Sequence, residues 1–209
     1  MKYSREKIFR TVHKKGYRYF IGNAIQNQYD VNIIGVRNSD TKYKVTNKFD
    51  DILTISYKDE LGRWKYHEYD CTTDPGTHWV KNVLKKSGVA VLRPGQYIGS
   101  HCIGQHKGVY EALTQKLPVI VYRDNDRDDE YNLDEGKTET GIFGINIHRA
   151  TKHSGKKSTQ IDKWSAGCQV IAGNDDWKEF MEICSKAVKT WGNSFTYTLI
   201  ESNDIKKWE

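Results

Sequence analysis

The sequence has no run of about 18 apolar residues, which excludes a membrane-spanning helix of ordinary length. It has no internal repeat and no low-complexity tract, so repeat and fibrous architectures are excluded as well. Its four cysteines are too few and too scattered to form a disulfide framework in a chain of 209 residues, and reduced thiols are expected. The first residues, Met-Lys-Tyr-Ser-Arg-Glu-Lys, lack the apolar stretch of a secretory signal, so we expect no signal peptide and synthesis in the cytoplasm.

An apolar fraction of 37% and six tryptophans provide enough material for one hydrophobic core. Residues 1–22 are expected to form a basic helical leader, and residues 23–209 a single domain. Residues 1–20 contain seven Lys or Arg side chains and one Glu, so the leader carries the whole net charge of +6. Such a leader favours an anionic partner, although a solvated basic helix face explains it equally well. No nucleic-acid motif accompanies the charge, which disfavours nucleic acid as the partner.

Apolar alternation and turn residues predict several short strands. A helix is indicated over residues 175–190, with Asn174 as its cap and Trp177, Phe180 and Cys184 on its apolar face. The predicted fold is therefore α+β and mainly β, with one helix at the N-terminus and one near the C-terminus. The predicted strands cover residues 30–37, 50–57, 63–69, 89–92, 117–122, 143–147 and 195–200.

One histidine and one cysteine frame a loop in the second half of the chain. His148 ends the predicted strand 143–147, and Cys168 follows Gly167, which allows a tight turn before the thiol. A cysteine is nucleophilic as a thiolate, and histidine is the usual base that takes its proton. Backbone N–H groups of Gly167 and Cys168 are candidates to stabilise an oxyanion. An inert core cysteine and a strand-end histidine would be the ordinary alternative.

This pattern resembles the catalytic signature of L,D-transpeptidases of the YkuD type. In that family a histidine at a strand end is followed, about fifteen residues later, by Ser/Thr-His-Gly-Cys; here His148 is followed by Ser165-Ala166-Gly167-Cys168. The resemblance extends to residues 73–77 and to the helix after the cysteine. Ala166 stands where the motif has histidine, and Val170 where it usually has Arg or Asn.

The resemblance implies an L,D-transpeptidase-like sheet or sandwich and acyl transfer or hydrolysis on the bacterial peptidoglycan stem peptide. Cys168 is then the nucleophile and His148 the base, Ser165 shapes the loop, and no cofactor is required. Arg149 is expected to bind a substrate carboxylate, and Trp164 and Ala166 to contact the substrate. The changes at 166 and 170 make a carboxypeptidase or endopeptidase as plausible as a cross-linking enzyme.

The whole chain is also similar to a group of uncharacterised tailed-phage proteins, which share the stretch Trp164–Gln169. This similarity implies synthesis in a host cytoplasm, followed by packaging into a virion or release to the cell wall. The alternative function is therefore a virion structural or cargo protein with the same fold and no turnover, whose partners are other virion proteins.

Carboxylates recur in the loop that begins at Asp124. Counted from that residue, they occupy the first, third, fifth and twelfth positions, which is typical of calcium loops: Asp124, Asp126, Asp128 and Glu135. Asp129 stands at the sixth position, where such loops need glycine, so a solvated acidic loop is the alternative. His101, Cys102 and His106 lack the paired spacing of a zinc site.

Overall fold

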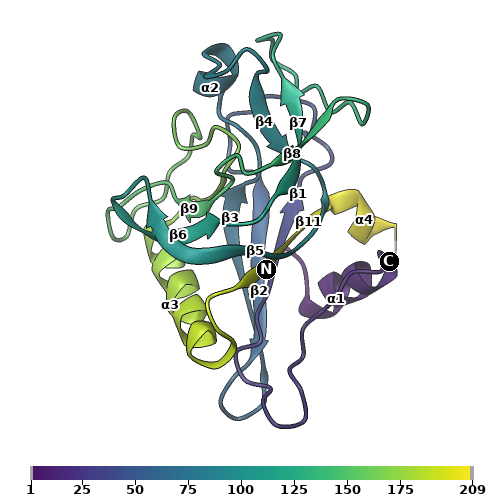
Figure 1. The fold of residues 1–209 in the computed structure, drawn as a ribbon, viewed down its shortest axis with the longest axis vertical. Helices are drawn as coiled ribbons and strands as arrows, with labels where there is room; N and C mark the ends of the chain where they lie inside the picture. Colours follow the sequence, from purple (N-terminus) through teal and green to yellow (C-terminus); the bar gives the residue numbers. More distant parts are fainter. Residues whose placement is uncertain (1, 208–209) are drawn as a thin grey trace.

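The computed structural model describes residues 2–207 and contains a closed eight-stranded β-barrel (Figure 1). Its strands follow one another around the barrel in the order β1, β11, β5, β6, β9, β10, β3, β2. The β1–β11 and β9–β10 pairs are parallel, so the barrel is mixed. Its strands are β1 (Asn32–Arg37), β2 (Asp51–Lys58), β3 (Trp64–Thr72), β5 (Gly95–His106), β6 (Tyr110–Gln115), β9 (Ile147–Arg149), β10 (Gln169–Ile171) and β11 (Phe195–Glu201).

A small sheet and four helices surround the barrel. The sheet has the order β4–β7–β8 and lies with α2 at one end of the barrel, while α3 covers one side and α1 and α4 lie near the other (Figure 1). The sheet strands are β4 (Val89–Leu92), β7 (Val119–Asp124) and β8 (Thr138–Gly141). The helices are α1 (Arg5–Lys14), α2 (Thr77–Lys81), α3 (Asn174–Trp191) and α4 (Ser202–Lys206). The expected fold class, mainly β within an α+β protein, is confirmed.

Both faces of strand β1 are covered, which explains why all six of its residues are buried. Ile33 belongs to the barrel core, whereas its neighbours Ile34 and Val36 belong to a second apolar cluster outside the barrel. Successive side chains of a strand point to opposite faces. Helix α1 supplies Ile8 and Val12 to the outer cluster, so the basic leader helix packs directly on the barrel wall.

Two local expectations were wrong, and one strand was missed. The predicted strand 143–147 is irregular chain up to residue 146, and β9 begins at Ile147. Helix α3 takes Gly173 as its N-cap without a side-chain cap, and Asn174 is its first helical residue. The missed strand is β5, which runs for 12 residues through a segment whose glycines obscure the alternation.

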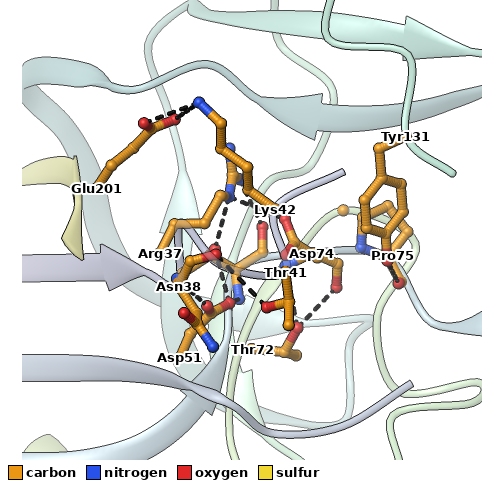
Figure 2. A network of polar contacts seen from close by, with 12 residues as sticks. Arg37, Asn38, Thr41, Lys42, Asp51, Thr72, Asp74, Pro75, Tyr131 and Glu201 are labelled. Atoms are coloured by element: carbon orange, nitrogen blue, oxygen red, sulfur yellow. Dashed lines mark hydrogen bonds and ion pairs between the residues drawn. The ribbon is translucent and has the colours of Figure 1, made fainter. Parts of the chain in front are cut away.

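A fully buried arginine organises one end of the barrel (Figure 2). Arg37 forms an ion pair with Asp74 at 2.9 Å and donates hydrogen bonds to the Thr73 hydroxyl and carbonyl, each at 3.0 Å. Asp51 accepts hydrogen bonds from the Thr73 hydroxyl and backbone N–H at 2.9 and 2.7 Å. Because buried charges are costly unless they are paired, this cluster holds the 73–74 segment against β1 and β2.

The substitution Arg37→Met should lower the free energy of unfolding by about 3–5 kcal/mol, because it leaves Asp51 and Asp74 buried without their cation. Urea unfolding followed by tryptophan fluorescence measures this loss. Lys42→Met is the matched control, because Lys42 pairs with Glu201 in a partly exposed place and should cost at most about 1 kcal/mol. Equal losses for the two variants would contradict the role given to the Arg37 cluster.

Candidate active site

Two adjacent parallel strands bring the predicted nucleophile and base to one face of the barrel wall. In the β9–β10 register, Val170 is the partner of His148, so the two side chains point to the same face. Cys168 precedes Val170 by two residues, immediately before β10, which places it on that face one step along the ladder. The register therefore gives Cys168 and His148 the same face of this strand pair, while the thiol's own hydrogen bond goes to the Gly144 carbonyl.

The His148 imidazole is held at its Nδ1 atom. Nδ1 donates a hydrogen bond to the Arg149 carbonyl at 2.9 Å, and the Tyr110 hydroxyl lies 3.3 Å from the same nitrogen. The neutral ring therefore carries its proton on Nδ1, which leaves a lone pair on Nε2. The Trp164 backbone is a second partner of the ring and, like Arg149, raises its pKa. Burial and the neighbouring charge of His106 lower the pKa of His148 to about 3, so the ring is neutral at physiological pH.

The thiol of Cys168 is partly buried and protonated at rest. Its Sγ donates to the carbonyl of Gly144 at 3.2 Å. Burial raises the pKa of the Cys168 thiol, and it outweighs the lowering effects of the Asn146 backbone N–H and the Lys107 ammonium. The resting pair is therefore a neutral thiol beside a neutral imidazole, and not a thiolate–imidazolium ion pair.

A groove of about 420 Å³ opens beside His148. His106 stacks on His148 with ring centroids 4.2 Å apart, and the charge of Lys107 lowers the pKa values of His106, His148 and Cys168 alike. Lys107 therefore lies near the thiol as well as both imidazoles. The residues lining the groove are His106, Lys107, Val109, Tyr110, His148, Lys163 and Trp164.

Ser165 and Gly167 shape the loop before the thiol. The Ser165 hydroxyl donates to the Cys168 carbonyl at 2.8 Å and accepts the Gly167 N–H at 3.1 Å. The Ser165 carbonyl accepts the N–H of Gly76 at 2.8 Å, which ties the loop to the 73–77 segment. The Gly167 N–H, which was expected to face an oxyanion, is thus bonded within the loop in this structure.

Asn146 is a residue of the site that the sequence analysis missed. Its backbone N–H faces the Cys168 thiol and lowers that thiol's pKa. Its side-chain amide donates to Nδ1 of His106 at 3.1 Å and accepts the Gln115 N–H at 2.9 Å. The only signal in the sequence is its position two residues before His148, which gave no reason to prefer it.

The three expected substrate-binding residues border different hollows. Arg149 and Trp164 line a second hollow of about 280 Å³, which shares Val109, Tyr110 and Trp164 with the groove. The Arg149 guanidinium lies over the Tyr110 ring, 4.3 Å from its centroid, and the Trp164 side chain is 46% exposed. Ala166 lines a separate hollow of about 120 Å³ with Ala90 and Phe143.

The carboxylates expected to bind calcium do not all converge. Glu135 accepts hydrogen bonds from Arg93 and Tyr122, and Asp128 accepts the Glu130 N–H at 2.7 Å. Asp124 and Asp126 do share a partner, Asn132. Within residues 2–207, no group of three or more His, Cys, Asp or Glu side chains is arranged to hold a metal ion, and His101 instead bonds Ser100 and the Ile145 carbonyl.

Comparison with known proteins gives no relative for this chain. No protein-family model matches it, and neither the curated proteins nor the solved structures contain a match. Among residues 2–207, no helix is long and apolar enough to cross a membrane. The functional argument therefore depends on the site's own geometry.

Gly167→Ala should destabilise the protein by about 2 kcal/mol more than Gly62→Ala. Both glycines have positive φ angles, +125° and +71°, so both substitutions strain the backbone. Only at Gly167 would the new Cβ meet backbone, 2.2 Å from the Ala90 carbonyl oxygen; nothing lies within 4 Å of the Gly62 position. Urea unfolding of the two variants measures the difference, and equal destabilisation would refute the close contact with β4.

Three buried histidines should make stability fall in acid. Burial lowers the pKa values of His101, His106 and His148 to about 4, 4 and 3. Below about pH 6.5 the unfolded chain therefore protonates these histidines, whereas the folded chain keeps them neutral. The contribution of the three neutral rings to the free energy of unfolding is present above that pH and is lost as the pH falls. The loss at pH 4 is on the order of 3 kcal/mol per histidine.

Urea unfolding between pH 7 and pH 4 measures this dependence. His101→Gln should lose less stability over that range than the wild-type protein, because one titrating group is gone. His153→Gln is the matched control, since this histidine lies exposed on the surface. A wild-type stability that is flat from pH 6.5 to pH 4 would contradict the buried neutral state of these rings.

Proposed function

We propose that this protein carries out thiol acyl transfer or hydrolysis on the peptidoglycan stem peptide, with Cys168 as nucleophile and His148 as base. The observation that carries the proposal is the β9–β10 register, which gives the two side chains the same face of this strand pair, with His148 lining an open groove. The hydrogen bond from Nδ1 of His148 to Arg149 is the second support, because it leaves Nε2 to accept a proton.

The first step breaks the resting contact of the thiol. Sγ of Cys168 turns from the Gly144 carbonyl, its proton passes to Nε2 of His148, and the sulfur forms a bond to the carbonyl carbon on the L-centre side of an L–D link. The carbonyl oxygen becomes an oxyanion. The Gly167 N–H is already bonded to Ser165. The group assigned to stabilise the oxyanion is therefore the positively charged Lys107 ammonium, whose charge acts on the Cys168 thiol.

The second step releases the amine. The carbon–nitrogen bond breaks, His148 returns its proton to the leaving nitrogen, and a thioester remains on Cys168. Water then resolves the thioester in hydrolysis, and a second amine does so in cross-linking. No cofactor enters these steps.

The two joined hollows suit a peptide that carries carboxylates. Lys107 and Lys163 line the groove, and Arg149 and Lys152 line the neighbouring hollow. No carboxylate is among the residues lining either hollow. Trp164 and Val109, 46% and 77% exposed, provide apolar contact between the two groups of cations. A substrate carboxylate would pair with these cations. This agrees with the role of carboxylate binding that the sequence analysis expects for Arg149.

A second candidate function is a virion structural or cargo protein that keeps the fold without turnover. The specific observation that favours the absence of turnover is the raised pKa of Cys168, because an activated nucleophile usually has a lowered one. The occupied Gly167 N–H supports the same alternative.

The deciding experiment treats peptidoglycan with the wild-type protein, Cys168→Ala and His148→Gln, and compares the soluble fragments by mass spectrometry. Each variant should lower the yield of cleaved or cross-linked stem peptides by at least about 100-fold, because each removes a group that makes or breaks a bond. Cys102→Ala is the matched control, since Cys102 is a partly exposed thiol on β5 and should leave the yield unchanged.

Identical fragment patterns for the wild-type protein and Cys168→Ala would refute the enzymatic proposal and support the virion protein.

A further inference from the structure

The loop after β7 brings three oxygen-bearing side chains together at a place that the proposed reaction does not use. One amide bridges two carboxylates: Nδ2 of Asn132 donates to Asp124 at 3.1 Å and to Asp126 at 2.6 Å. Counted from Asp124, these residues occupy the first, third and ninth positions of the loop. Those positions supply side-chain or water-mediated ligands in calcium loops.

A second observation is independent of the loop spacing. Asp124 is 1% exposed, and its Oδ2 atom has no hydrogen-bond partner. A buried carboxylate oxygen without a partner is destabilising, and such atoms are rare in folded proteins. A cation between the two carboxylates would give this oxygen a partner.

The position of Asp124 is fixed by the sheet. It is the last residue of β7 and pairs with Val89 on β4, next to Gly88. A Cβ on Gly88 would lie 1.8 Å from the Asp124 carbonyl oxygen, so the two backbones are in close contact. The loop also turns back at Arg127, whose φ of +66° is left-handed, and Lys81 holds the turn by donating to the Arg127 carbonyl at 3.2 Å.

We propose that Asp124, Asp126 and Asn132 form a calcium site in which the cation replaces the Asn132 amide N–H as the bridge between the two carboxylates. A half-turn of the amide about χ2 exchanges its nitrogen for its oxygen, which then becomes the third protein ligand. Water completes the coordination, since calcium takes six to eight oxygens in flexible geometry. Glu135 is not a ligand, because Arg93 and Tyr122 hold it.

Calcium added to the full-length protein after removal of metals with a chelator should raise the melting temperature by roughly 5–10 °C at 100 times the dissociation constant. Scanning fluorimetry measures the shift, and titration calorimetry the affinity. Magnesium, which prefers a rigid octahedron, should give a smaller shift at the same concentration. No shift and no heat with calcium, or an equal shift with magnesium, would overturn the proposal.

Two variants that each remove one negative charge distinguish calcium binding at this site from a general attraction of cations to the acidic loop. Asp126→Asn removes a ligand that is exposed and therefore tolerant of substitution, and it should weaken calcium binding at least tenfold. Glu130→Gln removes one negative charge from an exposed side chain of the same loop and should leave binding within about twofold. Equal weakening by the two variants would show a diffuse charge effect and overturn the site.

Asn132→Asp tests the same site by gain of function. A third carboxylate replaces the amide that now bridges the other two, so the metal-free protein should melt at a lower temperature. The calcium-dependent shift should become larger than that of the wild-type protein, because a charged ligand replaces a neutral one. A lower melting temperature that calcium does not restore would contradict the proposal.

Discussion

The parallel pairing of β9 with β10 is the constraint on which the candidate site depends. Both strands are only three residues long, yet they join the β5–β6 half of the barrel to the β2–β3 hairpin and so close the wall. Their register fixes which face His148 and Cys168 occupy, because a slip of one residue would send one of the two side chains to the opposite face. The pairing that closes the barrel therefore also positions His148 and Cys168.

Hydrogen bonds between buried polar groups connect the β9–β10 pair and the thiol loop to the rest of the barrel. Tyr197 on β11 donates to the Gln169 amide oxygen at 2.8 Å, and the Gln169 amide nitrogen donates to the Gly167 carbonyl at 3.2 Å. Arg37 holds the 73–74 segment, and Gly76 in turn bonds the Ser165 carbonyl. Tyr131, within the acidic loop, donates to the Pro75 carbonyl at 2.6 Å (Figure 2). The 73–77 segment thus connects the ion cluster, the acidic loop and the thiol loop.

Desolvation dominates the electrostatics of the site. It lowers the pKa of His148 and raises that of Cys168, so it favours the neutral form of both groups. Lys107 and the Asn146 N–H oppose this effect on the sulfur only in part. A neutral pair needs its proton transferred during attack, and a substrate that contacts the cations of the groove would change the field in which that transfer occurs.

The sequence alone determined the fold class, the apolar face of α3 and the residues around the thiol, because these follow from alternation, helical periodicity and local turn chemistry. It missed β5, whose glycines hide the period of two. It could not show that Asn146 and Lys107 act on the Cys168 thiol, or that His106 stacks on His148. Those residues come from other strands and turns, so only the closed barrel decides their proximity. The tertiary structure also decided the direction of the thiol's pKa, since burial depends on segments distant in the chain, whereas the motif specifies only which residue carries the sulfur.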